Sequence, residues 1–156
     1  MYTIKLKPLV ISLLISLGVG GLAGLISSNS TELYGELNLP ALSPPSVVFP
    51  IVWTILYILM GISAYLIYSS NSQNKDRALR IYGVQLLLNF IWPIVFFNMQ
   101  MYLLAFIILV VLWITVLVMI MSFYRISPLA AYLQIPYLLW LTFAGYLNLS
   151  IYLLNR

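Results

Sequence analysis

The chain consists of long uncharged apolar stretches that alternate with short polar or charged clusters. Four stretches stand out, approximately over residues 8–31, 37–75, 81–124 and 126–155. The third is too long for one membrane crossing, because at about 1.5 Å per residue it would measure roughly 66 Å against a hydrocarbon core of about 30 Å. We therefore expect a helical hairpin there, with its turn at Asn98, Met99 and Gln100.

This pattern predicts an all-α membrane protein, a five-transmembrane-helix bundle that forms one domain over residues 1–156. The expected helices cover approximately residues 8–26, 46–68, 80–97, 101–123 and 129–153, with an outer loop over 27–45. Ser127 and Pro128 form the start of the last helix, because proline is tolerated in a first helical turn.

The positive charges give this arrangement an orientation. Only Arg156 falls on one side of the membrane, and the other six basic residues fall on the opposite side: Lys5, Lys7, Lys75, Arg77, Arg80 and Arg125. Because basic residues concentrate in cytoplasmic segments, the N-terminus is expected inside and the C-terminus outside. A cleaved signal peptide over Met1–Ser28 is the less favoured alternative, since its removal would leave an even number of spans.

Composition agrees with a membrane protein and excludes several classes of function. Hydrophobic residues make up 63% of the chain and charged residues 6%, with a mean hydropathy of +1.07, which is not the composition of a soluble globular domain. The sequence has no Cys and no His, so it has no disulfide, thiol nucleophile, imidazole base or zinc site of the usual kind. Glu32, Glu36 and Asp76 are the only acidic residues, which disfavours paired-carboxylate chemistry. The net charge of +4 is too small and scattered to indicate nucleic-acid binding.

Polar and helix-breaking residues interrupt one apolar stretch, QLLLNFIWPIVFF at Gln85–Phe97. An unsatisfied amide is costly in hydrocarbon, so these side chains must face protein, water or a ligand. Helical spacing groups them with residues of two other helices into three faces at a similar depth: Gln85, Asn89, Trp92 and Phe96; Trp53, Tyr57 and Gly61; and Trp140, Ala144 and Asn148. Aromatic walls with a few amides are typical of a ligand cavity.

Helix packing is the alternative interpretation of the same residues, because small residues and amides also hold transmembrane helices together. Periodicity alone favours packing, whereas interior prolines at Pro50, Pro93 and Pro136 favour a cavity, since they kink helices and hold neighbours apart. The Gly20 and Gly24 pair fits either a dimer face or packing inside the bundle, and we favour the latter.

Two further segments have open interpretations. The outer loop is stiffened by Pro40, Pro44 and Pro45, and is either a cover over the bundle or a plain connector. The helix over 101–123 is apolar on all sides and is expected to face lipid or a partner, with Trp113 in a packing role.

Three ordered blocks resemble the TspO/MBR family, the tryptophan-rich sensory proteins and translocator proteins. They are PALSPPSVVFPIVWTILYILMG at Pro40–Gly61, QLLLNFIWPIVFF at Gln85–Phe97, and YRISPLAAYLQIPYLLWLTFAGYLN at Tyr124–Asn148. The resemblance extends over nearly all of the chain from Tyr34 onward. It implies a five-helix membrane bundle, which agrees with the count reached from length and charge.

The resemblance also implies a pocket for flat hydrophobic ligands, with protoporphyrin IX the expected ligand and no cofactor required. The matching pocket positions are Tyr34, Trp53, Tyr57, Asn89, Trp92, Trp140, Phe143 and Ala144. A tetrapyrrole would stack on the indoles while Asn89 offers a hydrogen bond. Family members usually carry tryptophans where this chain has Leu33, Leu42 and Val47, and a lysine where it has Leu39.

On this resemblance we expect a membrane receptor or sensor for porphyrins, in a bacterial cell membrane and paired as a homodimer. The alternatives are a transporter of tetrapyrroles or sterols, and an enzyme that degrades protoporphyrin IX in light. The residues provide no conventional catalytic or metal-binding group, and the resemblance would attribute degradation to Trp53 and Trp140. Besides the lipid bilayer, sterols are a further expected partner. Leu149, Tyr152 and Arg156 match a loose cholesterol-binding motif, but we interpret Tyr152 and Arg156 as membrane-interface anchors.

Overall fold

The computed structural model describes residues 4–156, and their regular structure is helical. The elements are α1 Leu6–Ile26, α2 Ser30–Glu36, α3 Val48–Tyr68, α4 Lys75–Pro93, the π-helical turn η1 Ile94–Asn98, α5 Tyr102–Tyr124, α6 Pro128–Leu133 and α7 Ile135–Leu154. Within these residues, five helical segments are long and apolar enough to cross a membrane: α1, α3, α4 with η1, α5, and α6 with α7. The predicted all-α, five-span bundle is confirmed, and the chain is an integral multi-pass membrane protein.

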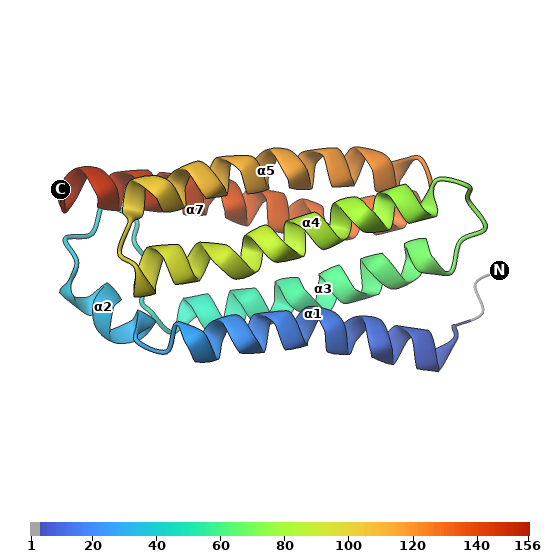
Figure 1. Ribbon diagram of the computed structural model, residues 1–156, viewed down its shortest axis with the longest axis horizontal. Coiled ribbons are helices and arrows are strands. Elements are labelled where there is room, and N and C mark those ends of the chain that lie inside the picture. The colour runs from blue at the N-terminus through green and yellow to red at the C-terminus, as the bar shows by residue number, and fades with distance from the viewer. Residues whose placement is uncertain (1–3) are drawn as a thin grey trace.

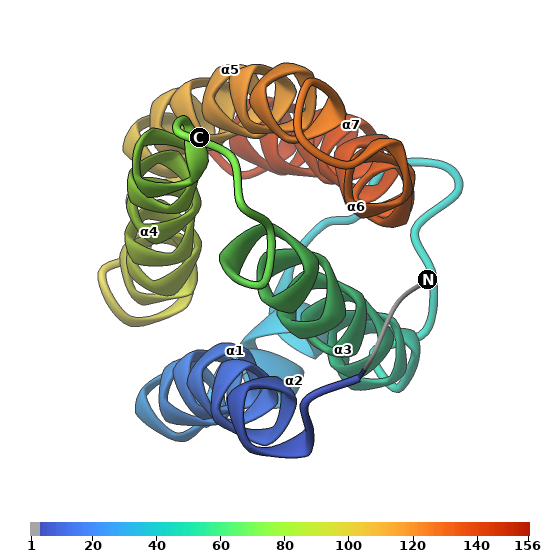
Figure 2. The same ribbon diagram turned by 90° about the vertical axis from the view of Figure 1, so that its right-hand side faces the viewer.

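The five spans surround a common interior, in the order α1, α3, α6 with α7, α5 and α4 when seen end-on (Figure 2). α1 packs mainly on α3, α3 also on α6, and α5 on α4, α6 and α7. The start of α1 and the connection from α3 to α4 lie at one end, and α2 and the C-terminal end of α7 at the other (Figure 1). We call the first the basic end, since Lys5, Lys75 and Arg125 are there, and the second the cover end. Which end faces the cytoplasm stays a prediction.

α4 begins at Lys75, five residues before the predicted start at residue 80. The prediction followed the edge of the apolar stretch, but a helix can continue into the charged region outside the hydrocarbon. Asp76 stands in its first turn, where the helix dipole favours a negative charge.

The last predicted span is a pair of helices, α6 and α7, joined at Gln134. Pro136 follows the junction and has no backbone N–H to donate to the preceding turn. Ser127 stands at the start of α6 as expected, and it caps the helix, because its Oγ accepts a hydrogen bond from the backbone N–H of Ala130 at 3.4 Å. Pro50, by contrast, lies in the first turn of α3, where a proline causes no kink.

Pro93 marks a change of helical type within the third span. α4 ends there and the π-helical η1 follows, closed by a hydrogen bond of 3.0 Å from the N–H of Met99 to the carbonyl of Ile94. Such π-turns are rare and occur frequently at functional sites.

α5 is exposed on one side only, so the prediction that it faces lipid or a partner holds for that side and not for the other. Its residues at alternating spacings of four and three are buried against α4, α6 and α7: Ala105, Leu109, Leu112, Val116, Met119 and Phe123. The opposite side carries exposed apolar residues. Trp113 has the expected packing role, since its Nε1 donates to Thr142 Oγ1 of α7 at 2.9 Å. A helix that is apolar on every side has no periodicity that separates a protein-facing side from a lipid-facing one.

Glycines bring α1 and α3 together. A Cβ at Gly61 would lie 2.8 Å from Ser16 Oγ and 3.1 Å from the Cα of Leu13, and one at Gly20 would lie 2.5 Å from the ring of Tyr57. Two hydroxyls bridge the contact, because Ser12 donates to the carbonyl of Gly61 at 2.7 Å and Ser16 to that of Tyr57 at 2.8 Å. Gly20 therefore packs inside the bundle, as favoured from the sequence, whereas Gly24 lines the cavity and makes no such close contact.

Candidate functional site

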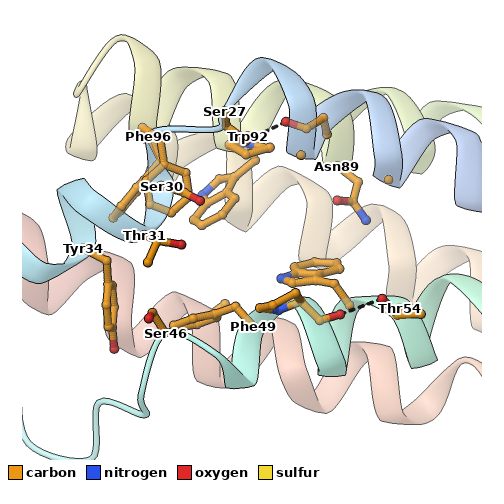
Figure 3. Close-up of a pocket in the computed structure, with 18 of the residues that line it drawn as sticks. Ser27, Ser30, Thr31, Tyr34, Ser46, Phe49, Thr54, Asn89, Trp92 and Phe96 are labelled. Carbon is orange, nitrogen blue, oxygen red and sulfur yellow. Dashed lines mark hydrogen bonds between the residues drawn. The ribbon is translucent and has the colours of Figure 1, made fainter.

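A cavity of about 550 Å³ occupies the cover-end half of the bundle. Its walls come from α1, α3, α4 with η1, and α7, and residues of α2 and its flanking turns line it at the cover end. Figure 3 shows Asn89, Trp92 and Phe96 facing Ser46, Phe49 and Thr54 across it, with Tyr34 toward the cover end. The three faces predicted from helical spacing meet here, but two of their members, Gln85 and Gly61, do not line the cavity.

Seven of the eight predicted site residues line this cavity: Tyr34, Trp53, Tyr57, Asn89, Trp92, Trp140 and Ala144. Phe143 does not. It lies with Ile55 and Leu139 in a shallow apolar groove on the outside of the bundle, between α3 and α7. Its ring contacts Trp140, with the centroids 5.5 Å apart, so Phe143 supports the cavity wall from behind.

Asn89 is the centre of a buried chain of hydrogen bonds, which we call the Asn89 network. Tyr57 OH donates to Asn89 Oδ1 at 3.0 Å, Asn89 Nδ2 donates to Tyr137 OH at 2.7 Å, and Tyr137 OH donates to Gln85 Oε1 at 2.7 Å. Only 3% of Asn89 is exposed. The side-chain amide of Asn89 thus already makes two hydrogen bonds within the protein. One N–H of its Nδ2 and one lone pair of its Oδ1 remain for a ligand.

A second pair of hydrogen bonds fixes Trp92. Its Nε1 donates to Asn148 Oδ1 at 2.9 Å, and Asn148 Nδ2 donates to the carbonyl of Tyr102 at 2.9 Å. The indole stacks on Phe96 with the centroids 5.1 Å apart. The Nε1 of Trp140 differs, because it is buried without a hydrogen-bond partner among residues 4–156.

Sequence reasoning missed Phe49 and Tyr137. Phe49 lines the cavity edge-on to Trp140 at 5.9 Å, and Tyr137 lies behind Trp53 at 6.2 Å while it connects Asn89 to Gln85. The helical spacing that identifies these residues was present in the sequence, since Phe49 precedes Trp53 by four residues and Tyr137 precedes Trp140 by three. Extending each predicted face by one turn would have found both.

Residues 27–47, which connect α1 to α3 and include α2, form the cover of the cavity. Tyr34 OH donates to the carbonyl of Pro44 at 2.6 Å, and its ring packs edge-on against Phe49 at 5.1 Å. Burial raises the pKa of the Tyr34 phenol, so it stays protonated and remains a donor at neutral pH. The structure thus favours a cover over a plain connector, with a short helix where only a loop was predicted.

The C-terminal end of α7 holds the cover in place. Asn155 Oδ1 accepts from the N–H of Asn38 at 3.0 Å while its Nδ2 donates to the carbonyl of Asn38 at 2.9 Å. Tyr146 OH donates to the carbonyl of Ala41 at 2.6 Å. Leu42 and Val47, where relatives usually carry tryptophan, are 81% and 61% exposed and do not line the cavity.

Replacing Tyr34 with Phe should loosen the cover. The substitution removes the hydrogen bond to Pro44, worth about 1 kcal/mol, and should therefore speed amide exchange in residues 27–47 about fivefold. Hydrogen–deuterium exchange with mass spectrometry measures this, and Tyr124→Phe at the exposed basic end is the control. Unchanged exchange in the cover of Tyr34→Phe would show that the phenol does not hold it.

The lining determines what the cavity can do. It consists of aromatic, aliphatic, small, hydroxyl and amide residues, and the lining carries no charged side chain among the described residues. Such a cavity can hold a flat hydrophobic molecule and contact a few of its polar atoms. Within residues 4–156 there is also no group of three or more His, Cys, Asp or Glu side chains that could hold a metal ion.

Comparison with known proteins gives the same family as the sequence motifs. The TspO/MBR family model matches residues 11–154. The chain is 36% identical over 152 residues to the tryptophan-rich protein TspO of Archaeoglobus fulgidus, covering 97% of this chain and 99% of that protein. It is 36% identical to the tryptophan-rich sensory protein of Cereibacter sphaeroides, in a match that covers 80% of this chain and 77% of that protein. It is 34% identical to the human translocator protein, in a match that covers 76% of this chain and 72% of that protein.

Proposed function

This chain belongs to the TspO/MBR family, and from that membership we propose that it is a membrane receptor or sensor whose cavity binds porphyrins and related flat hydrophobic molecules. One observation carries the proposal: Trp53, Trp92 and Trp140 come from three different helices and line one cavity beside Asn89. The protein would act in a bacterial cell membrane with its basic end inside.

The cavity offers each part of a porphyrin a suitable surface. The macrocycle faces would pack on indole and phenyl rings, which favour offset-stacked or edge-on contacts. The remaining N–H of Asn89 would donate to a polar atom of the ligand. Hydroxyls of Thr31 and Ser46 line the cavity near the cover, where carboxylate side chains of a porphyrin could accept hydrogen bonds.

Light-dependent degradation of the bound porphyrin is the second candidate function. Its specific support is that Trp53 and Trp140, which the family resemblance would make responsible, both line the cavity. The described lining supplies no carboxylate through which transport could be coupled to an ion, so coupled transport is not proposed.

A tryptophan-fluorescence titration with protoporphyrin IX in the dark tests the proposal. The detergent-purified protein should show saturable quenching, and Asn89→Ala or Trp140→Phe should each weaken the affinity about tenfold, equivalent to about 1.4 kcal/mol. Trp113→Phe is the matched control, because Trp113 lies outside the cavity and packs on Thr142.

Non-saturable quenching that neither cavity variant changes would contradict the proposal, since it would mean that the porphyrin partitions into detergent. If saturable binding is found, illumination of the complex tests the second candidate. Bleaching of the bound porphyrin that disappears in Trp53→Phe or Trp140→Phe would support degradation.

A further inference from the structure

Hydroxyl side chains gather at the cover end of the cavity. Ser30 and Thr31 belong to the first turn of α2, and Ser46 lies two residues before α3 begins. Figure 3 shows these three beside Tyr34, with Asn89 toward the opposite end of the cavity. We call Ser30, Thr31 and Ser46 the hydroxyl rim. The cavity therefore has an aromatic interior and a separate polar end under the cover.

The hydroxyls of the rim are free to bind a ligand. Two other hydroxyls of the lining already donate to backbone carbonyls one helical turn before them, Ser27 at 2.6 Å and Thr54 at 2.6 Å. Among residues 4–156, no hydrogen bond joins the three hydroxyls of the rim to the protein. Each of them can therefore donate one hydrogen bond to a polar atom of a ligand.

The charges of the cover bear on which polar atoms the rim accepts. Residues 27–47 contain two acidic side chains, Glu32 and Glu36 of α2, and no Lys or Arg. Arg156, the basic residue at this end, follows α7 and does not line the cavity. A carboxylate bound at the rim would meet hydroxyls and the like charges of the same short helix, and no opposite charge within the described lining.

Neutral donors alone do not compensate for the transfer of an ionised carboxylate out of water. An unpaired charge is far more costly to bury than a neutral polar group, even one that makes hydrogen bonds. An ester, amide or ketone oxygen accepts the same hydrogen bonds at a much smaller cost of desolvation. The rim therefore distinguishes ligands by the charge of their polar end.

We propose that the hydroxyl rim is a polar subsite that selects flat hydrophobic ligands with an uncharged polar end over ligands that end in carboxylates. This preference rests on the proposed function, because it names the class of ligand that the same cavity favours. The ring system packs among the indoles, and a neutral oxygen of the ligand accepts from Thr31 and Ser46. Protoporphyrin IX, which has two carboxylates, still binds but is not the preferred form of the macrocycle.

Titration with two forms of one macrocycle tests this preference. Protoporphyrin IX and its dimethyl ester share the ring system and differ in the charge of their polar end. In the dark fluorescence titration, the ester should bind the unmodified protein about tenfold more tightly than the acid. Thr31→Lys places a cation at the rim, on an exposed residue. It should tighten binding of the acid about tenfold relative to the ester, because the ammonium group pairs with a carboxylate.

Val47→Lys is the matched control. It adds the same charge to the cover outside the cavity, because Val47 is 61% exposed and does not line it. The preference for the ester should persist in this variant, which separates an effect at the rim from the net charge of the cover and from the greater hydrophobicity of the ester. The same ratio of affinities in both lysine variants, or tighter binding of the acid by the unmodified protein, would overturn the proposal. Saturable binding of neither ligand would contradict the proposed function, and the preference with it.

Removal of the free hydroxyls gives a second test. Thr31→Val combined with Ser46→Ala removes two donors to the ligand, and binding of the dimethyl ester should weaken about tenfold. Thr54→Val removes a hydroxyl of the same lining that already donates to the protein, so it should weaken binding much less. An equal loss of affinity in the two proteins would show that the rim does not hold the polar end of the ligand.

Discussion

Ala144→Phe should abolish saturable porphyrin binding while the protein still folds. Ala144 lines the cavity from α7, is 9% exposed, and lies one turn beyond Trp140. A phenyl group there would project into the space that the macrocycle is proposed to occupy, and that space is only about 550 Å³. We expect the apparent Kd in the dark titration to rise more than about 100-fold, corresponding to about 2.7 kcal/mol or more.

Gly145→Phe is the matched control for this substitution. Gly145 is the adjacent residue, does not line the cavity, and has no atom within 4 Å of the position where a Cβ would stand. It should bind protoporphyrin IX as the unmodified protein does. Retained binding in Ala144→Phe, with the cavity filled, would place the ligand elsewhere and contradict the proposed site.

Gly61→Ala should be strongly destabilising although it adds one methyl group. That methyl would lie 2.8 Å from Ser16 Oγ and 2.9 Å from Leu13 Cδ2, and it would also approach the backbone of Leu13. α1 would have to move away from α3, and the hydrogen bonds of Ser12 and Ser16 across the contact would lengthen. Overpacking of this kind costs about 1–3 kcal/mol. Thermal unfolding in detergent, followed by circular dichroism, should show a Tm lower by several degrees.

Gly18→Ala on the facing helix separates this packing effect from a general effect of glycine replacement. A Cβ at Gly18 meets no atom within 4 Å, and alanine is a better helix former by up to about 1 kcal/mol. Gly18→Ala should therefore be neutral or stabilising. A Gly61→Ala protein as stable as Gly18→Ala would mean that the two helices do not approach as closely as described.

The sequence was sufficient for the five spans and for most of the residues that line the cavity. Apolar length and the distribution of Lys and Arg specify five crossings, because the bilayer imposes one length and one charge bias on every helix. Helical spacing then identified the faces of Trp53, Asn89 and Trp140, since polar and aromatic residues are conspicuous in an apolar helix. That these faces line a cavity, instead of packing directly together, needed the structure.

Features that depend on contacts between helices could not be predicted. α6 and α7 both pack on α5, and α6 also packs on α3. Pro136 marks a possible kink in the sequence but gives no direction for it, so the division of the last span at Gln134 was not predicted. Phe143 shares a helix with Trp140, but its angle around the axis places it outside the cavity. The spacing of Tyr137 from Trp140 could have placed it near the cavity, but its role in joining Asn89 to Gln85 depends on contacts between helices.

The anchoring of the cover by Asn155 has a practical consequence for the engineering of this protein. The side chain that binds Asn38 belongs to Asn155, just beyond the end of α7. A purification tag, fluorescent reporter or surface attachment joined there would therefore disturb the hydrogen bonds that hold the cover. The connection between α3 and α4 lies at the opposite end of the bundle, away from the cavity. An insertion there leaves the cover untouched, which makes residues 70–74 the better place to attach a label for ligand-binding measurements.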